Sequence, residues 1–221
     1  MKKVFAIILA SLLFAACSLD NYDAPTSFLT GTVTYDGNPL YLDGGAVTFN
    51  LYQDGYEKNG PITVSVASDG TFSALVYDGT YHLYNIENNG PWMNDVAPVD
   101  IEVKGNTECK VEVTPYFVLE NASIVLAGDE VKGLCSIRQV AEGKTAKQIF
   151  MVVGKTPFLN DQSYSYLARK TSTSVKVGGS QTFSIATEDI EASASDYLYA
   201  RIGLEINGLN KFIYTETIRI K

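Results

Sequence analysis

Apolar and polar residues alternate with a period of two along most of the chain, which is typical of β-strands that bury one face. The pattern is clear at residues 46–52 and clearest at residues 197–206. In the second segment we expect one set of side chains to face a core, namely Leu198, Ala200, Ile202, Leu204 and Ile206. We expect the intervening set to form a more polar, outward face, made of Tyr197, Tyr199, Arg201, Gly203 and Glu205.

Tight-turn signals separate the alternating segments. Asp-Gly pairs stand at residues 69–70 and 78–79, and an Asn-Gly pair stands at residues 207–208. Because Gly accepts the positive φ of a two-residue hairpin turn, these pairs predict β-hairpins. Helix signals are almost absent, and only residues 188–195 suit a short helical turn. Many short strands at regular spacing predict an all-β fold built of β-sandwiches.

A change in charge divides the chain near Pro115. Residues 24–117 carry 12 acidic and 3 basic side chains, whereas residues 118–221 carry 11 acidic and 12 basic ones. We interpret this change as two separate modules, with one β-sandwich at residues 28–115 and a second at residues 116–221. One long sandwich with an uneven surface charge is the alternative interpretation.

The first 27 residues carry targeting signals. Lys2 and Lys3 precede an apolar run over residues 4–16, which suits a secretory signal and is too short to span a bilayer. Small residues lead directly to Cys17, as in a bacterial lipobox, so we predict a signal peptide at residues 1–16 and lipidation of Cys17. Residues 17–27 would then be the lipidated tether. Ordinary signal cleavage with an unmodified cysteine is the alternative.

Charge and composition exclude several classes of protein. The net charge of −8 opposes nucleic acid binding, which needs a basic surface. The single histidine, His82, excludes a zinc site made of several histidines, and we expect it to be an ordinary sheet residue. The nearest carboxylate pair for glycosidase chemistry, Asp95 and Asp100, has no feature that places both groups in one cleft. We therefore predict no enzymatic activity, no catalytic residue, no metal and no cofactor.

Two cysteines remain beyond Cys17, namely Cys109 and Cys135. Each shares the apolar parity of its predicted strand, as buried free thiols do. An envelope location also permits a disulfide between them. The sequence favours free thiols and leaves the disulfide open.

Aromatic residues are the feature with binding potential. The chain has 14 tyrosines, and its only tryptophan, Trp92, lies among turn formers and amides that include Asn89 and Asn94. A second candidate loop contains Tyr52 and Tyr56. Aromatic planes stack on the apolar C–H faces of sugars, while amides bind sugar hydroxyls. These five residues are candidate glycan-binding residues, and Trp92 is either a packed plug or an exposed platform.

Short motifs link both modules to known families. The first module resembles the transthyretin-like (prealbumin-like), or carboxypeptidase-regulatory-like, sandwich through L-T-G-T-V-T-Y-D-G-N-P-L, S-D-G-T-F-S-A-L and Y-D-G-T-Y-H-L. The second is similar to an immunoglobulin or fibronectin-III sandwich, because D-Y-L-Y-A-R-I resembles a tyrosine corner. The whole order resembles an uncharacterised family of two-domain Bacteroidetes-type lipoproteins that are encoded beside starch-utilisation-type glycan uptake systems. This resemblance implies glycan capture at the cell envelope and implies no catalytic residue.

Two functions remain open from the sequence. The first is a lipid-anchored outer-membrane protein, at the cell surface or facing the periplasm, that helps a transporter to capture polysaccharide. It predicts exposed loop aromatics, with Trp92 among them. The second is a structural or protein-interaction module of the envelope that binds no glycan. It predicts a buried Trp92 and an apolar patch on a strand edge or between the domains.

Overall fold

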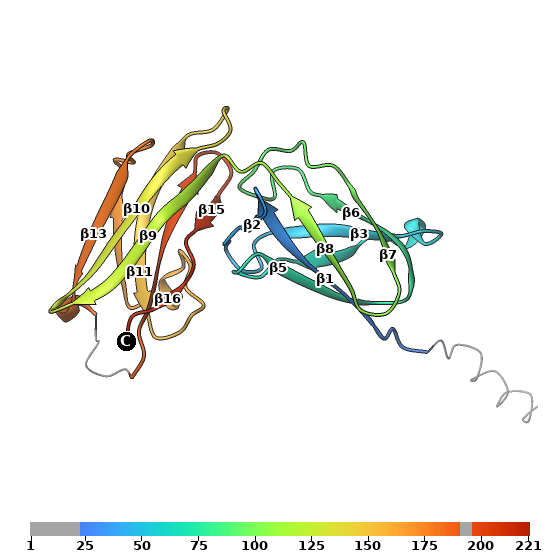
Figure 1. Cartoon of the computed structure of the whole chain (residues 1–221), viewed down its shortest axis with the longest axis horizontal. Coiled ribbons are helices and arrows are strands. Elements are labelled where there is room, and N and C mark those ends of the chain that lie inside the picture. The colour runs from blue at the N-terminus through green and yellow to red at the C-terminus, as the bar shows by residue number, and fades with distance from the viewer. Residues whose placement is uncertain (1–22, 191–195) are drawn as a thin grey trace, which may run out of the picture.

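The structure is a computed structural model that describes residues 23–190 and 196–221. It confirms the predicted all-β class, with two β-sandwiches side by side (Figure 1). The predicted signal peptide, the predicted lipidation site Cys17 and residues 18–22 of the predicted tether lie outside the described residues. Within the described part, the chain forms no helix that is long and apolar enough to cross a bilayer.

The N-terminal sandwich has two sheets of four strands each. Its strands are β1 (Ser27–Tyr35), β2 (Asn38–Pro39), β3 (Thr48–Gln53), β4 (Ile62–Ser65), β5 (Thr71–Val76), β6 (Gly79–Asn85), β7 (Val99–Val103) and β8 (Thr107–Glu112). One sheet has the order β4-β3-β6-β7. In the other, β1 pairs antiparallel with β2 and β5 on one edge and parallel with β8 on the other. The parallel pair joins the two ends of the domain sequence, a contact that local pattern does not predict.

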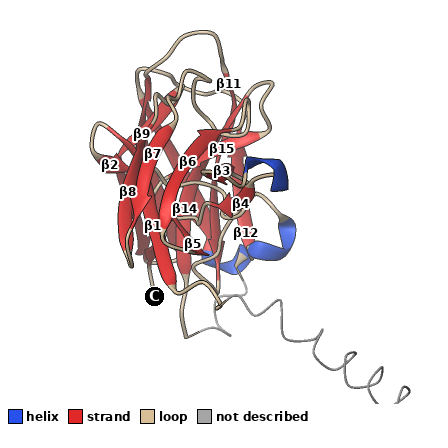
Figure 2. Ribbon diagram, turned by 90° about the vertical axis from the view of Figure 1, so that its right-hand side faces the viewer, coloured by secondary structure: helices blue, strands red, loops and turns tan. Residues whose placement is uncertain are grey.

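The C-terminal sandwich also has two sheets. Its strands are β9 (Phe117–Ala127), β10 (Glu130–Gln139), β11 (Ala146–Gly154), β12 (Ala168–Ser172), β13 (Ser180–Ala186), β14 (Tyr199–Ile206), β15 (Lys211–Tyr214) and β16 (Ile218–Arg219). One sheet has the order β13-β10-β9 and the other the order β12-β11-β14-β15, with β16 also paired to β14. Short 3-10 turns lie beside the strands (Figure 2), namely η2 (Glu57–Asn59), η3 (Ser163–Ser165) and η4 (Thr187–Asp189). The turn η4 covers the start of residues 188–195, the segment predicted to be helical, and residues 191–195 lie outside the described residues.

The alternating patterns place the core as expected. In β3, Phe49 and Leu51 are fully buried. In and beside β14, all five predicted core side chains are buried, from Leu198 to Ile206. Buried side chains of the second sheet complete each core, for example Val33 on β1 and Ile137 on β10, so each domain has the layered core that its sequence period requires.

The prediction of an outward face on β14 is wrong. Arg201 and Glu205 are only 1% and 5% exposed, and Gly203 is buried as well. Part of the N-terminal domain covers this face, since Arg201 Nη2 donates to the carbonyl of Leu42 at 3.0 Å. Glu205 accepts hydrogen bonds from two neighbours on its own sheet, Lys147 and Gln148. Alternation alone predicts that a polar strand residue such as Arg201 faces solvent, whereas in the fold Arg201 faces the other domain.

Candidate functional site

A groove opens at the end of the N-terminal domain that lies away from the C-terminal domain. Figure 1 shows this end at the cyan helical turn, which is η2. We call it the tyrosine groove, and it has a volume of about 690 Å³. Its lining residues are Leu51, Gln53, Tyr56, Asn59, Gly60, Pro61, Ile62, Tyr77 and Asp78. This volume lies within the range of small-molecule sites in proteins.

Local sequence shapes one wall of the groove. After β3, Gly55 has a φ of 81°, and Gly60 has the same φ after η2. These left-handed conformations favour glycine, and they turn the chain out of β3 and back into β4. The side chain of Glu57 steadies the first turn, because its Oε1 accepts a hydrogen bond from the Gly55 amide at 3.0 Å. The result is a loop that presents Tyr56 to the groove.

Two exposed tyrosines and one isoleucine supply the apolar surface of the groove. Tyr56 is 57% exposed, Tyr77 is 44% exposed and Ile62 is 42% exposed. The hydroxyl of Tyr77 donates to the carbonyl of Asp23 at 2.7 Å, which restrains this ring. Exposed aromatic side chains of this kind offer both a flat apolar face and a polar tip to a ligand.

Amides and a carboxylate supply the polar groups of the groove. The amides are those of Gln53 and Asn59. The Asp78 carboxylate accepts hydrogen bonds from Ser27 Oγ at 2.5 Å and from the Gly105 amide at 2.8 Å. The hydrogen bond from Ser27 lowers the pKa of Asp78 most, and the one from Gly105 lowers it further, so the carboxylate stays ionised.

Tyr56 is the one sequence-predicted candidate that lines this groove. Tyr52 packs edge to face against Tyr84 on the neighbouring strand β6, with ring centroids 5.7 Å apart. Asn89 and Asn94 hold loops in place instead. Asn89 Oδ1 accepts a hydrogen bond from the Thr48 amide at 2.7 Å, and Asn94 Oδ1 accepts one from the Asn88 amide at 2.8 Å.

Trp92 is a packed plug and not a platform for sugars. Its side chain is 1% exposed and stacks on Phe49, with ring centroids 6.2 Å apart. The indole Nε1 donates to Asn85 Oδ1 at 3.1 Å, so its polar atom is satisfied inside the domain. A glycan-binding role for Trp92 is therefore wrong, because no ligand in solvent can reach its ring.

The structure also brings together three polar groups that sequence reasoning did not connect. His82 lies in the middle of β6, as expected of a sheet residue. Its Nδ1 is 2.6 Å from a carboxylate oxygen of Asp100, and its Nε2 is 2.8 Å from one of Asp54. Both hydrogen bonds raise the pKa of His82, and the one to Asp100 makes the larger contribution. Pairing of β6 with β7 could have suggested the first contact, but the loop residue Asp54 gave no signal.

Two further site predictions concern carboxylates and thiols. Asp100 of the Asp95–Asp100 pair is engaged with His82, and Asp95 lies in an exposed loop. Within residues 23–190 and 196–221, no group of three or more histidine, cysteine or acidic residues could hold a metal ion. Cys109 and Cys135 are free thiols, as the sequence favoured.

Comparison with known proteins adds the family. Residues 27–114 match the model described as "Protein of unknown function (DUF3823) N-terminal domain". Residues 117–219 match the model described as "Domain of unknown function (DUF3823_C)". The chain belongs to the DUF3823 family. This confirms the resemblance to a two-domain family of uncharacterised function.

Solved structures of DUF3823 proteins resemble the chain over both domains. One from Parabacteroides merdae is 40% identical, with a TM-score of 0.83 over 90% of this chain and 100% of that one. One from Bacteroides ovatus is 28% identical, with a TM-score of 0.79 over 88% and 98%. A Bacteroides uniformis protein named a "putative carbohydrate binding protein" is 16% identical, with a TM-score of 0.70 over 89% and 99%. Among proteins of curated function, none matches the chain.

Proposed function

We propose that this DUF3823 protein binds carbohydrate, without transforming it, through the tyrosine groove. The observation that carries the proposal is the pairing of two exposed tyrosines with amides in one cavity of about 690 Å³. Stacking on Tyr56 and Tyr77 would bury the apolar faces of sugar rings, and Gln53 and Asn59 would bind their hydroxyls. The name of the Bacteroides uniformis relative supports the same class of ligand.

The proposed setting follows from the N-terminal sequence. We place the protein on the outer membrane, held by a lipid on Cys17, as an accessory to a glycan transporter. The run over residues 4–16 and the small residues before Cys17 support this placement. Lipidation is checked by mass spectrometry of the membrane-extracted protein, in which acylation would raise the mass of the N-terminal peptide and Cys17→Ser would remove the increase.

Replacing Tyr56 with alanine tests the groove. Tyr56 is largely exposed, so Tyr56→Ala should leave the melting temperature unchanged and weaken glycan binding roughly tenfold or more, which is about 1.4 kcal/mol. Tyr164→Ala is the matched control, because Tyr164 is 84% exposed and lies in the other domain. Calorimetry against plant and mucin polysaccharides gives the affinities. Equal glycan affinities of Tyr56→Ala and Tyr164→Ala would contradict glycan binding in the tyrosine groove.

An interaction module of the envelope is the second candidate. Phe28 on β1 and Leu75 on β5 are cross-strand partners, and each is 49% exposed. Such an apolar pair on a sheet face suits contact with another protein, and the burial of Trp92 is what this function predicts. Failure of the wild-type protein to bind any polysaccharide in the same calorimetric panel would favour this function over carbohydrate binding.

A further inference from the structure

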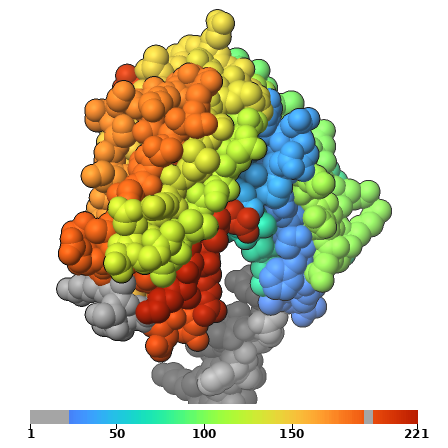
Figure 3. Space-filling view, turned by 60° about the vertical axis from the view of Figure 1, so that its left-hand side comes forward, coloured from blue at the N-terminus to red at the C-terminus, as the bar shows by residue number. Residues whose placement is uncertain are grey.

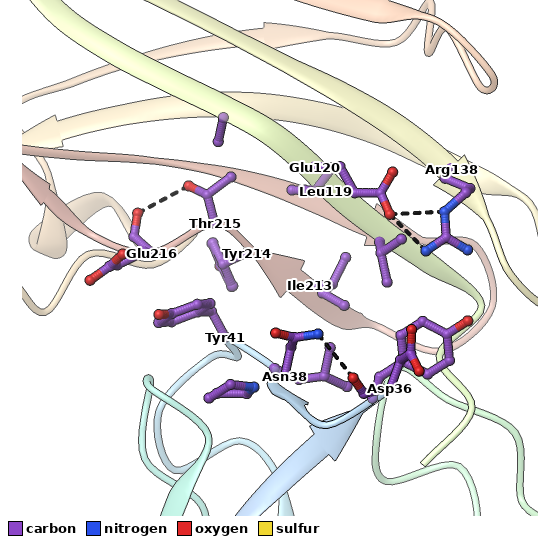
Figure 4. Close-up of a pocket in the computed structure, with 15 residues that line it drawn as sticks. Asp36, Asn38, Tyr41, Leu119, Glu120, Arg138, Ile213, Tyr214, Thr215 and Glu216 are labelled. Atoms are coloured by element: carbon purple, nitrogen blue, oxygen red, sulfur yellow. Dashed lines mark hydrogen bonds and ion pairs between the residues drawn. The ribbon is translucent and has the colours of Figure 1, made fainter. Parts of the chain in front are cut away.

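A second cavity lies where the two domains meet, and we call it the interdomain pocket. Figure 3 shows the surface hollowed between the blue N-terminal strands and the lime and red segments of the C-terminal domain. The pocket has a volume of about 300 Å³. Figure 4 shows that both domains supply its polar walls, with Asp36, Asn38 and Tyr41 from one and Glu120, Arg138 and Glu216 from the other.

Unusual backbone conformations surround this pocket. Asp36 has a φ of 51° in the turn between β1 and β2 and lines the pocket itself. Asn121 also has a φ of 51°, in a β-bulge of β9 opposite Cys135. The residues on either side of Asn121, which are Glu120 and Ala122, both line the pocket. Bulges and left-handed non-glycine residues concentrate at functional sites, where they aim particular side chains.

Direct hydrogen bonds between the two domains fix the position of one side of the pocket relative to the other. Lys211 Nζ donates to the Ala46 carbonyl at 2.5 Å, and the Tyr214 amide donates to the Tyr41 carbonyl at 2.9 Å. The 40%-identical Parabacteroides merdae structure aligns over all of its own length, across both domains, with a TM-score of 0.83. These contacts fix the two sides of the pocket without a ligand, as in most ligand sites.

The chemistry of the walls suits sugar hydroxyls. Arg138 Nε and Nη2 both donate to Glu120 Oε1, at 2.9 and 2.6 Å, which holds the guanidinium rigid. The same guanidinium lies 5.9 Å from the ring centroid of Tyr35. Among the described residues, Asp36 and Glu216 have no ion-pair partner. Planar carboxylates, an amide and a guanidinium beside tyrosine rings can bind hydroxyls and stack on ring faces.

We infer that the interdomain pocket is a second carbohydrate site, specific for a neutral sugar. This inference rests on the proposed function and assigns its ligand class. Three carboxylates face one guanidinium in the pocket lining, and that guanidinium is already paired. The unpaired carboxylates repel uronic acids and sulfated sugars at short range.

Strand β1 connects the two sites. At its start, Ser27 bonds to Asp78 of the tyrosine groove, and at its end Tyr35 lines the interdomain pocket. The nine residues of β1 set a separation of about 26 Å, at roughly 3.3 Å per step. A polysaccharide long enough to span that distance engages both sites at once, and its second contact is intramolecular. Polymers therefore bind more tightly than oligosaccharides that fill one site.

Filling the pocket tests this inference. Ala122→Leu adds bulk at an exposed residue that lines the pocket, and Ser123→Leu is the control, at the exposed neighbour outside it. Glu216→Gln is a second pocket variant that changes charge without changing shape. Calorimetry would use xyloglucan, galactomannan and starch polymers, short oligosaccharides of each, and polygalacturonate. We expect Ala122→Leu and Tyr56→Ala each to lower polymer affinity tenfold or more, and Ser123→Leu to leave it unchanged.

The outcomes separate this inference from the proposed function. Polymer binding that survives Ala122→Leu and Glu216→Gln but falls in Tyr56→Ala would overturn the second site and leave the groove. Loss in Ala122→Leu but not in Tyr56→Ala would support the pocket and reject the groove. Polygalacturonate binding as tight as that of the neutral polymers would overturn the assignment to neutral sugars.

Discussion

Arg201 and Tyr214 stack at the domain junction, with the guanidinium carbon 3.4 Å from the centroid of the Tyr214 ring. Arg201 is 1% exposed, and its Nη2 donates to the Leu42 carbonyl of the other domain. Burial lowers the pKa of Arg201 and raises the pKa of Tyr214. A buried guanidinium is costly unless its partners are in place, and the Leu42 carbonyl that partners Arg201 comes from the other domain, so docking of the domains stabilises the buried Arg201.

Removal of Arg201 should loosen the junction. Arg201→Ala takes away the stacking on Tyr214 and leaves the Leu42 carbonyl without its donor, at a cost of about 2–4 kcal/mol. Arg169→Ala is the control, since Arg169 lies 4.0 Å above the Phe150 ring but is partly exposed, and it should cost about 1 kcal/mol. Urea unfolding of both variants measures the difference, and equal losses would contradict the proposed role of the stack.

The same junction shows what the sequence could and could not predict. Period-two alternation predicted the strands and the core side of β14, because which face of a strand is buried is encoded locally. The same alternation places Arg201 in solvent, because nothing in a local pattern indicates that a second domain will cover a strand. The parallel pairing of β1 with β8 was missed for the same reason, since it joins residues about 78 positions apart.

Trp92 packing can be tested through Gly90. A Cβ at Gly90 would lie only 2.2 Å from the Trp92 ring, so Gly90→Ala should destabilise the N-terminal domain by about 1–3 kcal/mol and shift Trp92 emission to the red. Gly179→Ala is the control, because its nearest neighbours would lie 3.7 Å away. Thermal unfolding followed by fluorescence measures both effects. Unchanged emission in Gly90→Ala would contradict the close contact.

Composition and loop pattern point to a kind of binding chemistry more readily than to the residues that could supply it. The 14 tyrosines, with amides beside them in two loops, predict surfaces that could bind sugars, and the tyrosine groove places Tyr56 beside the amides of Gln53 and Asn59. The sequence leaves Trp92 open between a packed plug and an exposed platform, because a loop rich in Gly, Pro and Asn can either expose an aromatic ring or fold over it. Here Asn85 accepts the indole hydrogen bond, which makes burial favourable. That partner is the last residue of β6, seven positions before Trp92, and only the fold shows that the loop brings the indole back to it.

His82 should titrate above the ordinary histidine range. Both ring nitrogens face carboxylates, so the protonated form is favoured and the pKa in the folded state is raised. The stabilisation is fully present below the unfolded pKa of about 6.5 and is lost as the pH rises through the raised folded value. NMR titration is unambiguous because the chain has one histidine. Asp100→Asn should lower the pKa of His82 more than Asp54→Asn does, and the control Asp95→Asn should leave it unchanged. If neither Asp100→Asn nor Asp54→Asn altered the pKa of His82, the pairing with these carboxylates would be excluded.

The thiols of Cys109 and Cys135 should react slowly with alkylating reagents in the folded protein, and Cys109 should react before Cys135. Burial raises the pKa of Cys109 to about 11, with a smaller contribution from the Glu108 carboxylate, and burial raises that of Cys135 to about 12. At pH 8 about one Cys109 in a thousand is then a thiolate, and Cys135 is also enclosed in its core. In a Cys17→Ser background, alkylation by iodoacetamide should modify Cys109 slowly and Cys135 only when the C-terminal domain unfolds. Cys109→Ser isolates the second reaction, and rapid modification of Cys135 under native conditions would show that this core opens readily.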